Sequence, residues 1–244
     1  MTSMIWDLWG DGRREAHLPR GARTIAKTLL KGTPHPVPRR DPASVTLSAP
    51  RLDDADLAAL SAVLRQDDAV DTSDATRVRH LGGKSTPDLL HRRRDDRATA
   101  PDAVVRPENH DEVAAVLAVC GARGIAVVPF GGGTSVVGGL QPDAGGLRAV
   151  VSLDLSRTSA LLALDELSLL ATFGAGTSGP DAEEMLARHG LTLGHFPQSF
   201  EHASLAAIVR TSGTSTYLQV FNVEEGFVGL LFKEFLLVPC GLLA

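Results

Sequence analysis

The sequence has few of the features that mark metal-binding or secreted proteins. Only two cysteines occur among its 244 residues, Cys120 and Cys240, and neither belongs to a Cys-x-x-Cys or Cys/His ligand pattern. No apolar run opens the chain as a secretory signal would, because Asp7 and Asp11 lie where that run is needed. These absences predict no metal site and a location in the reducing cytoplasm.

Long apolar runs and an excess of positive charge are missing too. Lys233, Glu234 and Pro239 interrupt residues 226–244, which therefore fall short of the roughly 18 apolar residues that a membrane-spanning helix needs. We interpret this segment as part of a core, as an interface or as a tail without its natural context. The formal net charge of −5 provides no general attraction to nucleic acid. We therefore expect neither a stable membrane span nor a nucleic-acid partner.

The composition, 43% hydrophobic and 22% charged, is ordinary for a globular protein and sufficient for a core. Residues 1–50 hold many prolines and predict an extended, wrapping arm with a short helix over residues 24–30. Apolar spacing predicts a further helix over residues 53–64. Residues 65–100 are polar, and the run HRRRDDR (residues 91–97) predicts a solvated surface because it mixes both signs of charge.

After residue 101 the pattern becomes one of interleaved strands and helices. We expect a strand at residues 103–106, a helix that Asn109 caps and that Gly121 or Gly124 ends, and a buried strand at residues 125–130. Such a βαβ unit contains a parallel pair of strands. Further on, the sequence predicts a strand at residues 149–153, a hairpin of residues 161–164 and 167–173, and a helix that begins at Pro180 and ends at Gly190.

Glycines gather directly after the predicted strand of residues 125–130. The stretch GGGTSVVGG (residues 131–139) contains five glycines in nine residues. Glycines in such number cost backbone entropy, and a tight turn would need only one or two. The usual reason for them is close approach of a ligand to backbone N–H groups, which together form an anion-binding nest. Thr134 and Ser135 add hydroxyl donors, so the loop predicts a diphosphate site.

Two common phosphate-binding motifs do not fit the sequence. The stretch GGKS (residues 82–85) resembles the end of a Walker loop, but Val78 stands where the first glycine belongs. A Rossmann fingerprint could begin at Gly131, but Val136 stands at its third glycine and no long helix follows. A nucleotide- or phosphoprotein-binding module of another class, resting on the GKS and HRRRDDR stretches, is kept as an alternative hypothesis.

Several motifs occur in the order in which a known family of flavoproteins carries them. PFGGGTSVVGGL (residues 129–140) resembles the diphosphate loop of the vanillyl-alcohol oxidase, or PCMH-type, FAD-binding oxidoreductases. The likeness is closest to the alkyldihydroxyacetonephosphate synthase and D-lactate/glycolate oxidase branch, and it covers about residues 80–205. The further segments that resemble the family are GKSTPDLL (83–90), PDAVVRPENHDEV (101–113), SLDLSR (152–157) and the stretch of residues 175–204.

The resemblance implies an α+β fold, with a PCMH-type FAD-binding domain made of a small parallel βαβ subdomain and a mixed sheet with helices. It also implies a set of FAD-binding residues in the glycine loop and in later segments. These are Pro129, Gly131, Gly132, Gly133, Thr134, Ser135, Gly138, Gly176, Pro197, Gln198, Ser199 and Ser204. Many relatives attach flavin covalently to a histidine of this loop. Thr134 occupies that place here, so we expect non-covalent FAD.

The implied activity is the flavin-dependent oxidation of a small-molecule substrate, either a hydroxy acid or an alkyl/glycerol-phosphate compound. The sequence identifies no catalytic residue, substrate or electron acceptor. His195 and His202 lie in the family-like stretch of residues 175–204. For His195 we favour a hydrogen bond to the loop over proton transfer, and for His202 a plain surface position.

The likeness fails after Ser204. Ala206 and Ala207 stand where the family has a pair of glycines, and we find no match beyond Thr216. We therefore divide the chain into an N-terminal arm with helices (1–95), a partial FAD-binding domain (96–215) and a divergent hydrophobic tail (216–244), without a cap domain. We favour a truncated copy of a flavoenzyme over a short protein completed by a partner. The alternative function is a catalytically inactive FAD-binding module.

Overall fold

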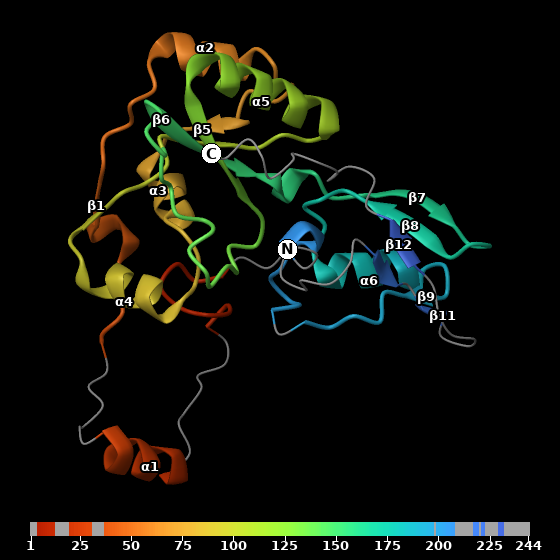
Figure 1. Cartoon of the computed structure of the whole chain (residues 1–244), viewed down its shortest axis with the longest axis horizontal. Helices are drawn as coiled ribbons and strands as arrows, with labels where there is room; N and C mark the ends of the chain where they lie inside the picture. Colours follow the sequence, from red (N-terminus) through yellow and green to blue (C-terminus); the bar gives the residue numbers. More distant parts are fainter. Residues whose placement is uncertain are drawn as a thin grey trace.

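The computed structural model describes residues 4–12, 20–30, 37–197 and 199–207, together with short strands at residues 217–219, 221–222 and 229–231 (Figure 1). The helices are α1 (Arg20–Leu30), α2 (Asp54–Ser61), α3 (Asp74–Arg77), α4 (Thr86–Arg94), α5 (His110–Arg123) and α6 (Gly179–Ala187). The strands are β1 (Thr46–Leu47), β2 (Val70–Asp71), β3 (Arg97–Ala98), β4 (Ala103–Val105), β5 (Ile125–Phe130), β6 (Ala149–Asp154), β7 (Leu161–Asp165), β8 (Leu170–Phe173), β9 (Leu191–Thr192), β10 (Tyr217–Gln219), β11 (Phe221–Asn222) and β12 (Gly229–Leu231). The 3-10 helices are η1 (Pro42–Ser44), η2 (Val78–His80) and η3 (Leu155–Arg157).

The central sheet has the strand order β2-β4-β6-β5. Strands β4 and β5 both pair in parallel with β6, and β2 pairs antiparallel with β4. The predicted βαβ unit of β4, α5 and β5 is therefore present, but β4 and β5 do not pair with each other because β6 lies between them. The carboxyl ends of β4, β5 and β6 point to the same edge of the sheet, which is where ligands bind in open parallel sheets.

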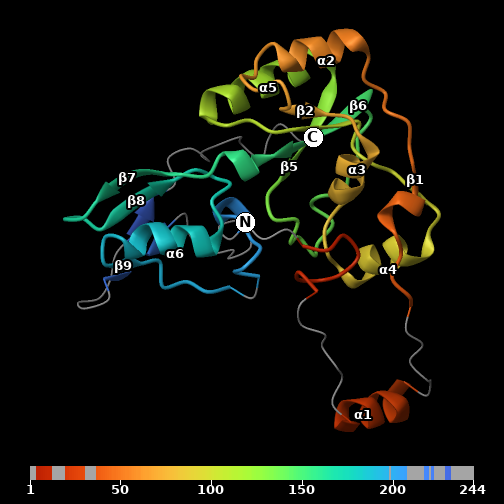
Figure 2. The ribbon, with the colours of Figure 1, turned by 180° about the vertical axis from the view of Figure 1, so that it is seen from behind.

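Helix α5 covers one face of this sheet together with α2 (Figures 1 and 2). The predicted limits of α5 are confirmed: Asn109 Oδ1 accepts a hydrogen bond from the N–H of Glu112, and Gly124 ends the helix with φ 63°. Val116 and Cys120 lie on its buried stripe against the sheet. Each such fully buried aliphatic side chain contributes about 1.5–3 kcal/mol.

Strand β5 differs from the prediction of a buried strand. It is the edge strand of the sheet, and Ile125 is its one fully buried residue. The central strand β6 is buried along its whole length. An apolar run such as IAVVPF does not by itself distinguish an edge strand from a central one, since strand order depends on segments that come later in the chain.

A second lobe lies beside the sheet and contains β7, β8, α6 and β9 (Figure 2). The predicted hairpin is confirmed, because β7 and β8 pair antiparallel. The predicted helix is confirmed as α6, with Ser178 as its cap, and Gly190 follows it with φ 69°. Phe173, Leu186 and Leu205 are buried together in the core of this lobe.

The stretch HRRRDDR does not lie wholly on a solvated surface, as we had predicted. Its first four residues end α4, which Ser85 starts with a reciprocal capping box. Arg92 is only 8% exposed and donates hydrogen bonds to the carbonyl oxygens of Trp6 and Gly82. The mixed charges of the stretch did not reveal that Arg92 is buried. Its hydrogen-bond partner Trp6 lies far away in the sequence, so nothing local shows that contact.

Short strands do form in the segment that we predicted to be a divergent tail. Strand β10 pairs with β12, and β11 pairs with β9 of the second lobe. Most of residues 226–244 lie outside the described residues, so the interpretation of that segment remains a prediction. No helix in the described parts of the chain has the length and apolar character needed to cross a membrane. The same parts contain no group of His, Cys, Asp and Glu residues that could hold a metal ion.

The three-part division of the chain also remains a proposal. Strand β2, which precedes the proposed boundary at residue 95, joins the same sheet as β4. Leu60 of α2 packs into the same buried cluster as Val105 and Val151.

Candidate functional site

The glycine loop follows β5 at the carboxyl edge of the sheet and packs against residues 202–204. A Cβ atom on Gly131 would overlap Ser204 Oγ, and one on Gly132 would overlap the carbonyl oxygen of His202. Gly133 has φ 70°, a conformation that favours glycine. Two of the three consecutive glycines therefore allow close approach of the protein's own chain, a reason that we did not foresee from the sequence.

The backbone amide groups at the start of this loop have no acceptor among the described residues. Within the described residues, no hydrogen bond is formed by the backbone N–H of Gly131, Gly132, Gly133, Thr134 or Ser135. Backbone donors are normally paired when they are not in water. A row of unpaired N–H groups directly after a strand is what an anion-binding nest presents.

Ser204 packs against the same loop at Gly131. Its side chain is 1% exposed, and its Oγ atom has no hydrogen-bond partner in the described structure. The position is held by an antiparallel bridge to Ser178 and by a hydrogen bond from Leu205 N–H to the carbonyl oxygen of Thr177. A buried hydroxyl without a partner is unfavourable unless a ligand or water completes it.

A cavity of about 820 Å³ lies at this junction. Its size is within the range of small-molecule and cofactor sites. The residues that line it come from the N-terminus, the start of α4, the glycine loop and the segment after β9: Trp9, Lys84, Ser85, Thr86, Pro87, Thr134, Val136, Pro197, Ser199, Ala203 and Ala207.

The GKS stretch (residues 83–85) contacts the glycine loop directly, and Lys84 and Ser85 line the cavity beside it. Lys84 N–H donates to the carbonyl oxygen of Ser135 at 2.7 Å, and Gly83 has no room for a Cβ atom beside that same oxygen. Ser85 caps α4. The motif therefore does not need a nucleoside triphosphate to explain it, because its glycine, lysine and serine each have a structural partner.

The Lys84 side chain binds the beginning of the chain. Its Nζ atom donates to the carbonyl oxygens of Ile5, Trp6 and Leu8, the last two at 3.0 Å. Burial, and to a smaller extent the positive charge of Arg92, lowers the pKa of Lys84 to about 7, while Asp7 opposes the shift. The sequence pattern showed a lysine in a familiar motif but not these partners, which lie more than seventy residues away.

The predicted FAD-binding residues are only partly brought together. Thr134, Pro197 and Ser199 line the cavity. Ser204 contacts the loop at Gly131. The remaining glycines of the loop, Gly132 and Gly133, and Ser135 lie in the same continuous segment.

Three other predicted residues do not line the cavity, and a fourth is not among the described residues. Gly176 is buried against the carbonyl oxygens of Leu155 and Thr158, and its N–H donates to Thr158. Gly138 is exposed with φ 76°, and Pro129 is exposed on the edge strand β5. Gln198 lies outside the described residues.

The two histidines differ in their surroundings. His202 is buried, with 9% of its surface exposed, so the prediction of a plain surface position is wrong. The reason is that the segment carrying it packs on the glycine loop. His195 is half-buried and does not line the cavity.

A polar cluster beneath the loop was missed by the sequence reasoning. The His80 ring lies 4.3 Å from the Phe130 ring, and its Nε2 lies 3.3 Å from Asp154 Oδ2. Burial opposes ionisation of Asp154, but hydrogen bonds from His80 and from the Ser156 N–H outweigh it and keep the pKa of Asp154 below its usual value. The cluster supports the end of β5 from which the glycine loop starts.

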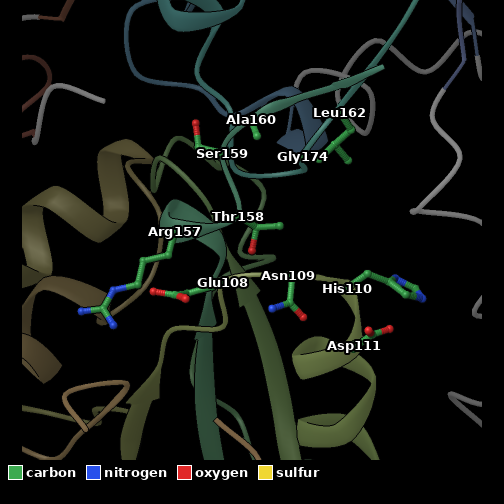
Figure 3. Close-up of a pocket in the computed structure, with 10 residues that line it drawn as sticks. All are labelled: Glu108, Asn109, His110, Asp111, Arg157, Thr158, Ser159, Ala160, Leu162 and Gly174. Carbon is green, nitrogen blue, oxygen red and sulfur yellow. The ribbon is translucent and has the colours of Figure 1, made fainter. Parts of the chain in front are cut away.

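A second, smaller cavity of about 300 Å³ lies at the start of α5 (Figure 3). Glu108, Asn109 and His110 come from the turn before α5 and its first residue, and Thr158 comes from the segment after η3. Arg157 also lines this cavity, but its guanidinium group is already bound to Asp68. No residue of the glycine loop lines it, so it is separate from the candidate site.

Comparisons with known proteins identify the family of this chain. The profile of the family described as "FAD binding domain" matches residues 101–229. The match includes β4, α5, β5, the glycine loop and the second lobe. It also passes Thr216, so the expectation that the likeness ends there is wrong.

Relatives are found in the branch that the motifs predicted. The chain is 35% identical over 153 residues to the alkyldihydroxyacetonephosphate synthase of Trypanosoma brucei brucei. The aligned region covers 62% of this chain and 25% of that protein. The chain is 32% identical over 131 residues to glycolate oxidase subunit GlcD of Bacillus subtilis, covering 53% of this chain and 27% of that protein.

Solved structures confirm the fold. A structure of alkyldihydroxyacetonephosphate synthase superposes with a TM-score of 0.72 at 26% identity, over 84% of this chain and 42% of that one. p-Cresol methylhydroxylase shares the fold alone, with a TM-score of 0.53 at 17% identity over 69% of this chain and 32% of that one. The chain thus spans between a quarter and about two fifths of the length of these relatives. Because the family profile covers more than half of the 244 residues, this chain belongs to the FAD binding domain family, and its cofactor is FAD.

Proposed function

We propose that this chain binds FAD non-covalently at the glycine loop and forms the flavin-binding part of an oxidoreductase. One observation carries the proposal. Among the described residues, five consecutive backbone N–H groups (131–135) have no acceptor and the buried Ser204 hydroxyl beside Gly131 has no partner. Thr134 of this row and Ala203, next to Ser204, line a cavity large enough for a cofactor.

The chemistry of these groups suits a diphosphate. Amide hydrogens carry partial positive charge, so a row of them binds phosphate oxygens without a cationic side chain. Thr134 and Ser199 line the cavity, and their hydroxyl groups are further hydrogen-bond donors. Lys84 lines the cavity too, but its Nζ atom is engaged by carbonyl oxygens of the N-terminal residues.

The lining also agrees with non-covalent binding. None of the described residues that line the cavity is a histidine, cysteine or tyrosine, the side chains able to form a bond to a flavin ring. Thr134 takes the place at which many relatives carry such a histidine. Denaturation with acid is therefore expected to release all bound flavin into solution.

The bound flavin supplies the hydride acceptor in this family. The chain's own residues would bind and orient it: the loop amides would hold the diphosphate, and the Ser204 hydroxyl would form a hydrogen bond with the cofactor. Lys84 is the one titratable side chain among the described residues of the lining, and burial together with its carbonyl partners limits its use as a base. We therefore assign no catalytic residue within this part of the chain.

The substrate that we propose is a hydroxy acid or an alkyl/glycerol-phosphate compound, supported by the names of the relatives. The matched relatives are much longer than this chain, so substrate and turnover belong to the proposal. A catalytically inactive FAD-binding module remains the alternative outcome.

The first test is direct binding. The purified chain is incubated with FAD, desalted and scanned for flavin absorbance, and the precipitate and supernatant are compared after acid treatment. We expect a yellow protein whose flavin moves entirely to the supernatant. A folded but colourless chain would contradict the proposal, and flavin in the precipitate would contradict non-covalent binding.

The second test concerns activity. FAD-loaded chain is mixed without oxygen with glycolate or with an alkyl-glycerol phosphate, and bleaching of the flavin absorbance is recorded. Bleaching supports an oxidoreductase. Loaded chain that is reduced by dithionite but by neither substrate favours the inactive module.

A further inference from the structure

Residues 4–12, which we call the N-terminal loop, reach the cavity although they lie far from the glycine loop in sequence. Trp9 of this loop is among the residues that line the cavity. In both views the chain after β5 (green) runs toward this loop (red) (Figures 1 and 2). The family profile begins only at residue 101, so the loop lies outside the matched domain.

Buried cations hold the N-terminal loop in place. Lys84 Nζ binds the carbonyl oxygens of Ile5, Trp6 and Leu8. Arg92 donates to the carbonyl oxygen of Trp6 at 2.6 Å, and Arg93 donates to that of Asp7 at 2.9 Å. Burial of cations is unfavourable unless hydrogen bonds compensate for lost hydration. Their convergence on one short loop therefore gives that loop a defined conformation against the cavity.

The two tryptophans of the loop are placed differently. Trp6 is 8% exposed, packs with Val78 and Leu81, and donates through Nε1 to the carbonyl oxygen of Arg40. Trp9 is 38% exposed, and its Nε1 donates to the carbonyl oxygen of Lys84 at 3.0 Å. The hydrogen bond orients the indole while much of its apolar surface stays uncovered at the cavity. A large aromatic surface in such a position is suited to stack on a planar ring.

We propose that Trp9 forms an aromatic wall of the FAD cavity and packs against one of the two ring systems of FAD, the isoalloxazine or the adenine. The inference rests on the proposed function, since it requires FAD in this cavity. It assigns a cofactor-positioning role to the N-terminal loop, which Lys84 and Arg92 hold beside the start of α4.

The experiment compares FAD dissociation constants of the full chain and its variants by titration of flavin fluorescence. Trp9→Ala and Trp9→Leu remove the ring, and Trp9→Phe keeps a smaller ring. We expect the Ala and Leu variants to bind FAD about 5- to 100-fold more weakly, as expected for loss of a stacking contact, and the Phe variant to bind markedly better than both. Phe196→Ala is the matched control, because Phe196 is an exposed aromatic residue next to Pro197 that does not line the cavity. Its affinity should equal that of the unmodified chain.

The same variants are titrated with FMN and with ADP to identify the ring. A loss confined to FMN assigns the contact to the isoalloxazine, and a loss confined to ADP assigns it to the adenine. Equal FAD affinity of folded Trp9→Leu, Trp9→Phe and unmodified chain would overturn the inference and leave the proposed function intact. Absence of FAD binding by the unmodified chain would instead refute the proposed function itself.

Discussion

The two walls of the candidate cavity are built in different ways. The glycine loop is one continuous segment after β5, and its amide groups belong to consecutive residues. The second wall joins Trp9 to residues 84–87. Lys84 and Arg92 hold it through carbonyl oxygens of the N-terminal loop, which lie 76 to 86 positions away in the sequence. The first wall is therefore a local property of the chain, and the second exists only after folding.

Because the two walls are built differently, single substitutions should affect them to different degrees. The loop depends on missing side chains, because any Cβ atom at Gly132 meets backbone of residues 202–203 that cannot rotate away. The second wall depends on hydrogen bonds from the long side chains of Lys84 and Arg92. Loss of one of several donors weakens such a wall without closing the cavity. Changes in the loop are accordingly expected to have the larger effects.

The largest effect is expected for Gly132→Val. The new side chain would overlap the carbonyl of His202, so the loop and residues 202–204 must separate. We expect the free energy of unfolding to fall by about 3 kcal/mol or more and FAD binding to be lost, as measured by denaturant titration and flavin absorbance. Gly121→Ala is the control: this glycine lies in α5 with open space around its Cβ position, and the change should leave stability equal or higher. Unchanged FAD affinity in Gly132→Val would break the comparison.

The second effect concerns pH. The pKa of Lys84 is about 7 in the folded chain, against an ordinary value of 10.5 for an exposed lysine. Between these two pH values the unfolded state therefore binds more protons than the folded state. The free energy of unfolding should therefore rise with pH, by about 2 kcal/mol between pH 7 and 9, because burial makes the charged amine less favourable in the folded state than in the unfolded one. Urea titrations at several pH values measure this slope. The variant Lys84→Met should lack it, and an identical slope in both proteins would show that Lys84 is not the group responsible.

A smaller, local effect is expected for Arg92→Met. This change removes donors from the carbonyl oxygens of Trp6 and Gly82 and should lower the free energy of unfolding by about 1.5 kcal/mol. Amide hydrogen exchange should speed up in the N-terminal loop while the central sheet stays protected. Arg94→Met is the matched control on the same helix, where the arginine is exposed. Equal exchange rates in the two variants would show that the loop is held by other contacts.

The smallest effect is expected for Ser204→Ala, which should raise stability and weaken FAD binding. In Ser204→Ala the unpaired hydroxyl is removed, so the FAD-free chain should gain about 1 kcal/mol of stability. FAD binding should weaken about 5-fold, because one hydrogen bond to the cofactor is lost. Ser152→Ala removes another buried, unpaired hydroxyl, in β6, and should give the gain in stability without the loss of affinity. The same change in affinity for both variants would contradict a contact between Ser204 and FAD.

Much of the fold was predictable because its signals are local. The cap at Asn109, the left-handed Gly124 and the period of apolar residues between them set the limits of α5 before any packing is known. The hairpin of β7 and β8 and the helix α6 follow from turn residues and a proline in the same way. Strand order was not predictable, since β6 enters between β4 and β5 from later in the chain.

For the candidate site, the sequence by itself determined the glycine loop, because unusual backbone freedom in consecutive residues is visible in the letters. Only the tertiary structure decided that residues 202–204 press against that loop, that Gly176 packs elsewhere, and that the GKS stretch anchors the N-terminal loop. The physical reason is that a buried cation or hydroxyl is defined by its partners. Those partners come from segments whose meeting depends on the whole fold.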